Sequence, residues 1–253
     1  MFPKEHGAYG QLLFPLVSAL LVARPAAAAF ALAAAALAAF LSHESLLVLL
    51  GQRGTRATRE QGGQARRWFA WLAGLALVFG AAGVRLAPHA ARVALLVPLA
   101  CGGLLAVWIL RRRERTTAGE LLTAVSLSSL ALPVALAAGA PLPAALTCTL
   151  VFAVSFVVAT VSVRAVIMWA RHRAGTGTRV TAALVAVGGV AALAVLARAG
   201  VTAGVAPLAA LPVCGTGLVL ALGVPSPRHL RTIGWTLVAT TALTAIVLVA
   251  GLR

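Results

Sequence analysis

The feature that most limits the fold of this chain is a series of long apolar stretches, each near the length that a helix needs to cross about 30 Å of hydrocarbon. Hydrophobic residues make up 61% of the 253 positions, so a water-soluble fold of this size would lack the polar residues to cover its surface. The pattern predicts an all-α, polytopic membrane helix bundle with nine transmembrane helices. The expected spans are Tyr9–Ala23, Ala26–Leu50, Phe69–Val84, Val93–Leu110, Leu121–Ala138, Pro143–Ala170, Val180–Ala197, Val201–Val224 and Leu230–Leu252.

The segments between the spans are too short to form a second domain. None exceeds about twenty residues, which is below the size of a self-sufficient core, so residues 1–253 are expected to form a single integral membrane domain. The N-terminal segment has Lys, Glu and His before the first span and no small-residue cleavage site, so we expect no removable signal peptide. Cys101, Cys148 and Cys214 lie far apart inside apolar spans, which favours packing roles over a disulfide or a metal site.

The positive charges predict the orientation of the bundle. With nine spans, 16 of the 21 Lys and Arg residues fall on the side that holds the N-terminus and the segments after even-numbered spans. By the positive-inside rule this side is cytoplasmic, with the N-terminus inside and the C-terminus outside. The expected cytoplasmic loops lie near 51–68, 111–119, 171–179 and 225–230. Because topology accounts for the arginines, the net charge of +16 does not indicate nucleic-acid binding.

The most polar segment of the chain lies in Phe40–Trp68, where the second span ends. His43 and Glu44 are placed about two turns before the end of this span, and a loop with five arginines is expected to follow. Ionisable groups at that depth are costly and usually face the bundle interior or a wet cavity. We therefore interpret His43 and Glu44 as functional groups; the alternative is a pair that snorkels to the interface.

Two further segments place polar side chains on the same side of the membrane. The N-terminal residues Lys4, Glu5 and His6 precede the first span, where they contribute to a pocket or simply start a helix. At the end of the sixth span, one helical face carries Arg164, Met168, Arg171 and His172. Arg164 lies about two turns inside the membrane end and needs an anion there, which Glu44, Glu120 or a ligand would provide. The spacing of Thr117 and Glu120 resembles a capping box.

From these positions we expect one site, in which the N-terminal segment meets the ends of the second and sixth spans. His43 or Glu44 would lie within roughly 10 Å of Arg164 or Arg171, around a cavity of a few hundred Å³. Histidines titrate near neutral pH, so the proposed catalytic groups are His6, His43 and Glu44. Arginine forks match phosphate and carboxylate oxygens. The proposed ligand-binding residues are Lys4, Glu5, Arg53, Arg56, Arg59, Arg164, Arg171 and His172.

Two sequence motifs carry a resemblance to a known family. PKEHGAYGQLLFPL at the start and SHESLLVLLGQRGTRATRE after the second span resemble the YwiC-like bacterial membrane proteins. That resemblance implies a protein of the bacterial cytoplasmic (inner) membrane, and it assigns no reaction.

The order of spans and polar motifs also resembles, more loosely, the layout of UbiA-type intramembrane prenyltransferases. Those enzymes hold Mg²⁺ and an isoprenyl diphosphate through Asp-rich motifs after the second span and at the sixth. The corresponding positions here carry His43, Glu44, Arg53 and Arg56, and Arg164, Arg171 and His172. The chain contains no Asp, which argues against Mg²⁺ as a cofactor, and no metal ligand is assigned.

The function expected from these observations is the binding of an anionic, lipid-soluble ligand in a cytoplasm-facing polar cavity. A phosphorylated isoprenoid or a quinone-type headgroup fits this description, and membrane lipids are the expected partners. The chain is then a lipid-binding protein or a divergent transferase that acts on an isoprenoid or lipid substrate. The alternatives are a small-molecule or ion transporter, which would place polar groups near the membrane midplane, and a structural subunit.

Overall fold

In a computed structural model, the chain is a bundle of helices; the residues described are 6–111, 116–170, 175–223 and 226–253. No strand occurs in these ranges, which confirms the predicted all-α class. The helices are α1 (His6–Leu21), α2 (Ala27–Leu49), α3 (Thr55–Leu86), α4 (His89–Ala94), α5 (Leu96–Leu110), α6 (Thr117–Ser129), α7 (Ala131–Ala137), α8 (Leu142–Ala170), α9 (Thr176–Arg198), α10 (Ala206–Gly223), the 3₁₀ turn η1 (Pro227–His229) and α11 (Leu230–Leu252).

Two of the predicted spans are interrupted, the fourth near its start and the fifth in its middle, and in each case a proline explains the break. A proline has no N–H to donate to the carbonyl four residues earlier, and its ring clashes with that carbonyl. α4 ends at Ala94, four residues before Pro98, and α6 ends at Ser129, four residues before Pro133. When α4–α5 and α6–α7 are counted as single rods, the described residues form nine rods at the nine predicted places. Eight of them are long and apolar enough to cross a membrane, and the apolar part of α1, Tyr9–Leu21, is shorter.

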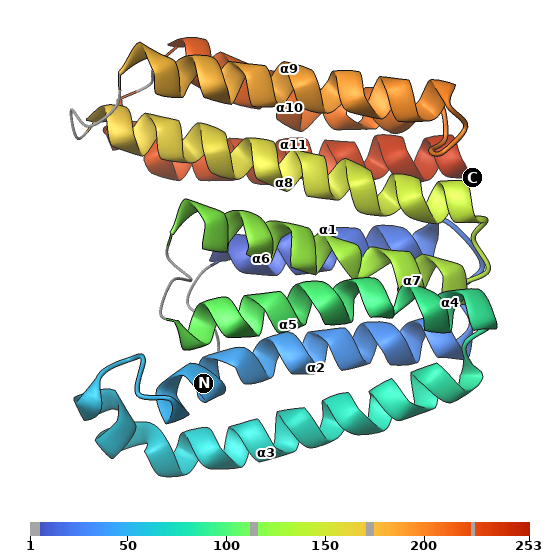
Figure 1. Ribbon diagram of the computed structural model, residues 1–253, viewed down its shortest axis with the longest axis vertical. Helices are drawn as coiled ribbons and strands as arrows, with labels where there is room; N and C mark the ends of the chain where they lie inside the picture. Colours follow the sequence, from blue (N-terminus) through green and yellow to red (C-terminus); the bar gives the residue numbers. More distant parts are fainter. Residues whose placement is uncertain (1–5, 112–115, 171–174, 224–225) are drawn as a thin grey trace.

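The rods lie side by side with their ends grouped at two ends of the bundle (Figure 1). The start of α1, the ends of α2, α5, α8 and α10, and the starts of α3, α6, α9 and α11 lie at the left end of the view, which we call the basic end. The other connections and the C-terminus lie at the opposite end. This alternation agrees with the predicted grouping of charged segments. Which end faces the cytoplasm stays a prediction of the positive-inside rule.

The core lies around α1, α7, α8 and α10, and it is built largely from small residues. Every residue of α7 is buried, and α7 packs on α1, α2, α4, α6 and α8. A Cβ atom added to Gly217 would lie 2.5 Å from the side chain of Val158, so only glycine permits this approach of α8 and α10. Such contacts hold helices together in lipid, where burial of apolar surface gives no drive.

The expected loop at 51–68 is wrong for most of its length, because α3 begins at Thr55. Hydropathy assigns polar residues to loops, but the Arg, Ala, Glu and Gln residues of this stretch are good helix formers. The 32 residues of α3 extend over about 48 Å at 1.5 Å per residue, which exceeds the hydrocarbon thickness of about 30 Å. We call its polar beginning, Thr55–Arg67, the α3 arm.

Candidate functional site

Glu44 and Arg53 form a two-pronged ion pair where α2 ends. Arg53 donates from Nε to Oε1 at 2.8 Å and from Nη2 to Oε2 at 2.6 Å, and the side chains of Arg53 and Glu44 are 26% and 15% exposed. The local sequence produces this contact, because α2 ends in a Schellman motif with Gly51 at φ 70°. Glycine adopts that conformation without strain, and the turn brings Arg53 back beside Glu44.

The connection between α2 and α3 also forms hydrogen bonds with the ends of neighbouring helices. The side-chain amide of Gln52 donates to the carbonyl of Ile109, near the end of α5, at 2.9 Å. The hydroxyl of Thr58 donates to the carbonyl of Val48 at 3.1 Å. Both bonds go to carbonyls in the last turn of a helix, so the segment that carries Arg53 is held in a defined position.

Arg56 and Glu60 form an ion pair along the α3 arm. Nε of Arg56 lies 2.7 Å from Oε1 of Glu60, and the side chains are 89% and 56% exposed. Surface pairs of this kind contribute little to stability. Arg59, Arg66 and Arg67 are exposed on the same arm and make no ion pair within the described part of the chain.

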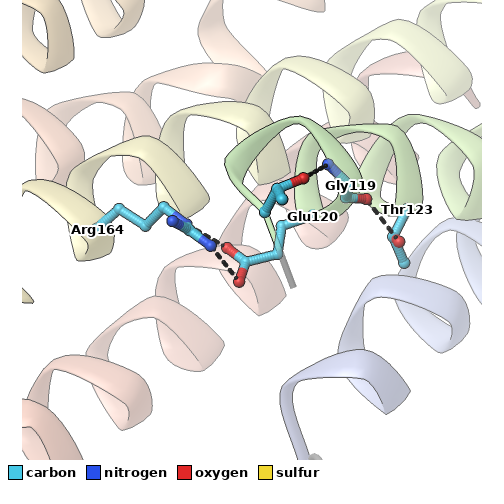
Figure 2. A network of polar contacts seen from close by, with 5 residues as sticks. Gly119, Glu120, Thr123 and Arg164 are labelled. Atoms are coloured by element: carbon cyan, nitrogen blue, oxygen red, sulfur yellow. Dashed lines mark hydrogen bonds and ion pairs between the residues drawn. The ribbon is translucent and has the colours of Figure 1, made fainter. Parts of the chain in front are cut away.

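Arg164 of α8 pairs with Glu120 of α6, and this contact is the centre of the polar network in Figure 2. Nε and Nη2 of Arg164 donate to Oε2 and Oε1 of Glu120 at 2.6 and 2.8 Å. The predicted capping box of Thr117 and Glu120 is wrong. The N-cap is Thr116, whose hydroxyl accepts from the backbone N–H of Gly119 at 3.2 Å, and Glu120 extends toward α8 because Arg164 offers it two donors.

The contacts do not bring the predicted site residues into one cluster. Glu44 is engaged by Arg53 and Arg164 by Glu120, so of the three anions considered for Arg164 the structure provides Glu120. α1 and α7 pack against both α2 and α8, and they lie between these two helices in Figure 1. His43 lies one residue before Glu44 in α2 and is itself in contact with other groups.

Several of the proposed site residues cannot be placed. Lys4, Glu5, Arg171 and His172 lie outside the described residues, and His6 is described only as the first residue of α1. The part played by these side chains therefore stays a prediction. The proposed convergence of the N-terminal segment with the ends of α2 and α8 also remains a prediction. The contacts of Glu44 and Arg164 do not support it.

The carboxylates described here do not suit a Mg²⁺ site. Magnesium takes carboxylate oxygens as ligands, but both oxygens of Glu44 accept from Arg53 and both oxygens of Glu120 accept from Arg164. No cluster of three or more His, Cys, Asp or Glu residues suited to a metal occurs in the described ranges.

Arg179 has a defined structural contact that the sequence reading missed. Its Nε donates to the carbonyl of Ala221 at 2.9 Å, near the end of α10, and its guanidinium lies 5.3 Å from the ring centroid of Trp169. Arginine favours both a helix C-terminus and an aromatic face. Nothing in the sequence distinguishes Arg179 from a topology charge, because the contact depends on the neighbouring positions of α8, α9 and α10.

A hollow of about 450 Å³ lies on α3, lined by Ala70, Trp71, Gly74, Leu75 and Val78. Its lining is apolar and comes from a single helix that packs along α2 at the edge of the bundle (Figure 1). The hollow differs from the predicted polar cavity in both lining and position. The sequence signal that could have revealed it is the spacing of these residues at intervals of three and four, which places them on one helical face.

The helical rods, the apolar outer surfaces and the arginine-rich end together define a polytopic integral membrane protein. A family model described as YwiC-like protein matches residues 2–135, just over half of the chain. The protein belongs to the YwiC-like family. No curated protein and no solved structure matched the chain, and the looser resemblance to UbiA-type prenyltransferases is not confirmed.

Proposed function

We propose that this protein binds a lipid-soluble ligand with an anionic, phosphate-bearing headgroup at its basic end, which by the positive-inside rule faces the cytoplasm of a bacterial inner membrane. The observation that carries the proposal is the division of the arginines into two groups. Arg53 and Arg164 are neutralised by half-buried glutamates. Arg59, Arg66 and Arg67 are exposed on the α3 arm and make no ion pair among the described residues.

The position of these arginines favours a lipid over a soluble anion. Trp68 and Trp71, which are 37% and 73% exposed, directly follow the arm, and exposed tryptophans are typical of the membrane interface. From Trp68 to Leu86 the helix rises about 28 Å, close to the hydrocarbon thickness of about 30 Å. The arm is thus placed at and beyond the headgroup level, where arginine forks meet phosphate oxygens.

A phosphoryl or prenyl transfer reaction has less support than binding. Such chemistry needs a residue that moves a proton or a metal that holds a diphosphate, and the described carboxylates are occupied by arginines. His6 and His43 remain the proton-transfer groups that the sequence predicts. The transporter alternative gains no specific observation from the described residues.

The proposal is tested by thermal unfolding of the purified protein in a neutral detergent, with and without lipid probes. Farnesyl phosphate and dioctanoyl phosphatidic acid are compared with their uncharged counterparts, farnesol and dioctanoyl glycerol. A ligand that binds the native state raises the melting temperature, so at least one phosphate probe should raise it above its uncharged counterpart, and added salt should reduce the difference. Equal effects of charged and uncharged probes would contradict the proposal.

A further inference from the structure

The outer face of α3 combines cationic and apolar surface in one continuous stripe. Arg59, Gly63 and Arg67 recur every four residues, and Trp71 and Gly74 continue the same face toward the membrane interior. The packing face of α3 lies on the other side, where Ala65, Leu72 and Gly83 are buried. The stripe therefore points away from α2 and toward the surrounding bilayer.

The upper part of this stripe has the geometry of a headgroup site. Arg59 and Arg67 are separated by about 12 Å along the helix, and Gly63 between them is exposed with no protein atom within 4 Å of an added Cβ. Side chains on a helix lean toward its N-terminus, so Arg67 extends from the interface toward the level of Gly63, whereas Arg59 reaches that level only when its long side chain turns back along the helix. The neighbouring acid, Glu60, is already engaged by Arg56 at 2.7 Å.

The lower part of the stripe has a shallow, open apolar depression along which a hydrocarbon chain can lie. The hollow of about 450 Å³ is centred on Gly74 and lies directly below Arg67 on the same face, bordered by Trp71 and Val78. An added Cβ at Gly74 would meet no protein atom within 4 Å. Charge and apolar surface are thus ordered as they are in a phospholipid molecule, with the headgroup above and the acyl chain below.

We propose that this α3 stripe is a binding site for an anionic diacyl phospholipid of the bilayer, with the phosphate between Arg59 and Arg67 and one acyl chain in the hollow at Gly74. The proposal rests on the proposed function and names the ligand class and the site. A bilayer phospholipid is favoured over an isoprenyl phosphate because the stripe is open to the surrounding lipid along its length. Trp68 and Trp71 mark the interface, and the phosphates of bilayer lipids lie just beyond it, on the side of the arginines.

The test uses fluorescence quenching of Trp71 in the full-length protein, with Trp68, Trp108, Trp169 and Trp235 changed to Phe. The protein is reconstituted in phosphatidylcholine vesicles that contain an equal fraction of either brominated phosphatidylglycerol or brominated phosphatidylcholine. Half-maximal quenching of Trp71 should need a smaller mole fraction of brominated phosphatidylglycerol than of brominated phosphatidylcholine. The mole fraction should be lower by about five-fold for each arginine that contacts the headgroup. Equal quenching by the two lipids would overturn the proposal.

Matched variants distinguish binding at a specific α3 site from a general attraction of anionic lipid to the positive charge of the basic end. R59Q/R67Q should abolish the preference, whereas R228Q/R231Q, which removes two exposed arginines near the start of α11 at the same end, should keep it. G74L fills the hollow and should also reduce the preference. If both arginine pairs reduce it equally, the attraction is diffuse and the α3 site is wrong.

If unlabelled farnesyl phosphate displaces the brominated lipid better than phosphatidylglycerol does, the occupant is an isoprenyl phosphate and the diacyl assignment is wrong.

The melting experiment distinguishes failure of this site from failure of the proposed function. If phosphate probes stabilise R59Q/R67Q as strongly as the unmodified protein, the ligand binds elsewhere at the basic end and only the α3 site is wrong. If they stabilise neither protein, both proposals are wrong.

Discussion

Single residues at the basic end show how charge is accommodated near the membrane boundary. Glu44 and Glu120 are each matched by one arginine through two hydrogen bonds of 2.6–2.8 Å. A half-buried carboxylate without such a partner would carry the cost of desolvation. Arg53 and Arg164, which the sequence suggests as ligand-binding residues, therefore act first as internal counterions.

The two kinds of ion pair should differ in their effect on stability. Glu120→Gln removes the charge that holds Arg164 and should lower the free energy of unfolding by about 1 kcal/mol, because hydrogen bonds to charged groups are worth more than neutral ones but solvent screens a side chain that is 43% exposed. The matched change Glu60→Gln breaks an exposed pair and should cost less than about 0.5 kcal/mol. Thermal unfolding in detergent measures both, and equal losses would contradict the structural role assigned to Glu120.

A second residue-scale prediction concerns Arg164 and Glu120 together. If their energies come from contact with each other, the double variant E120Q/R164Q should be more stable than the sum of the single effects predicts, by about 1 kcal/mol or more. A double-mutant cycle measures this coupling. Strict additivity would mean that the pair is not formed in the membrane.

For single helices, the sequence predicts where each helix lies in the chain better than it predicts how far the helix extends. Helical rods occur at all nine predicted places in the described residues, and eight of them have the length and hydropathy to cross a membrane, because the hydrocarbon thickness sets the length of a span. The α3 arm was missed because a helix that leaves the membrane needs no apolar face. The sequence names Glu120 among the possible anions for Arg164 but does not select it, because Glu120 faces Arg164 only through the packing of α6 on α8. The Glu44–Arg53 pair was not predicted, although Gly51 and the short separation make that contact local.

The packing of α3 on α2 gives a prediction at the scale of elements. A Cβ atom at Gly83 would lie 2.7 Å from Cδ2 of Leu32 and 3.1 Å from its backbone nitrogen. Gly83→Val should therefore force the helices apart and destabilise the protein by about 1–3 kcal/mol. Gly74→Ala meets no neighbour and should leave stability unchanged or slightly raised. Unfolding temperatures that fall equally for both would contradict the α2–α3 contact.

At the scale of the whole molecule, the matched family region ends within α7 at residue 135, and α8–α11 follow as a further group of helices (Figure 1). α1 joins the two parts, because it packs on α6, α7, α8 and α11. Arg253 reinforces this junction by donating to the carbonyl of Leu21 at 2.8 Å. The bundle is thus continuous from the family region into the C-terminal helices.

The orientation of the bundle is the whole-molecule prediction that charge makes. Reporter fusions near Gln61, Ala118 and Gly175 should report a cytoplasmic location, and fusions near His89 and at the C-terminus an external one. With the N-terminus inside, a cytoplasmic C-terminus would require an even number of spans and would contradict the crossing of the membrane by all nine rods.

If the basic end selects a phosphate-bearing anionic lipid from the membrane, that lipid should stay with the protein during purification. The most direct test of this selection is quantitative mass spectrometry of the lipids that remain with the protein after purification in a mild neutral detergent. We expect anionic phosphate lipids to be enriched over their share of the source membrane. R59Q/R67Q should lose this enrichment, whereas R228Q/R231Q should keep it. Retained lipids in the same proportions as the membrane would contradict the claim.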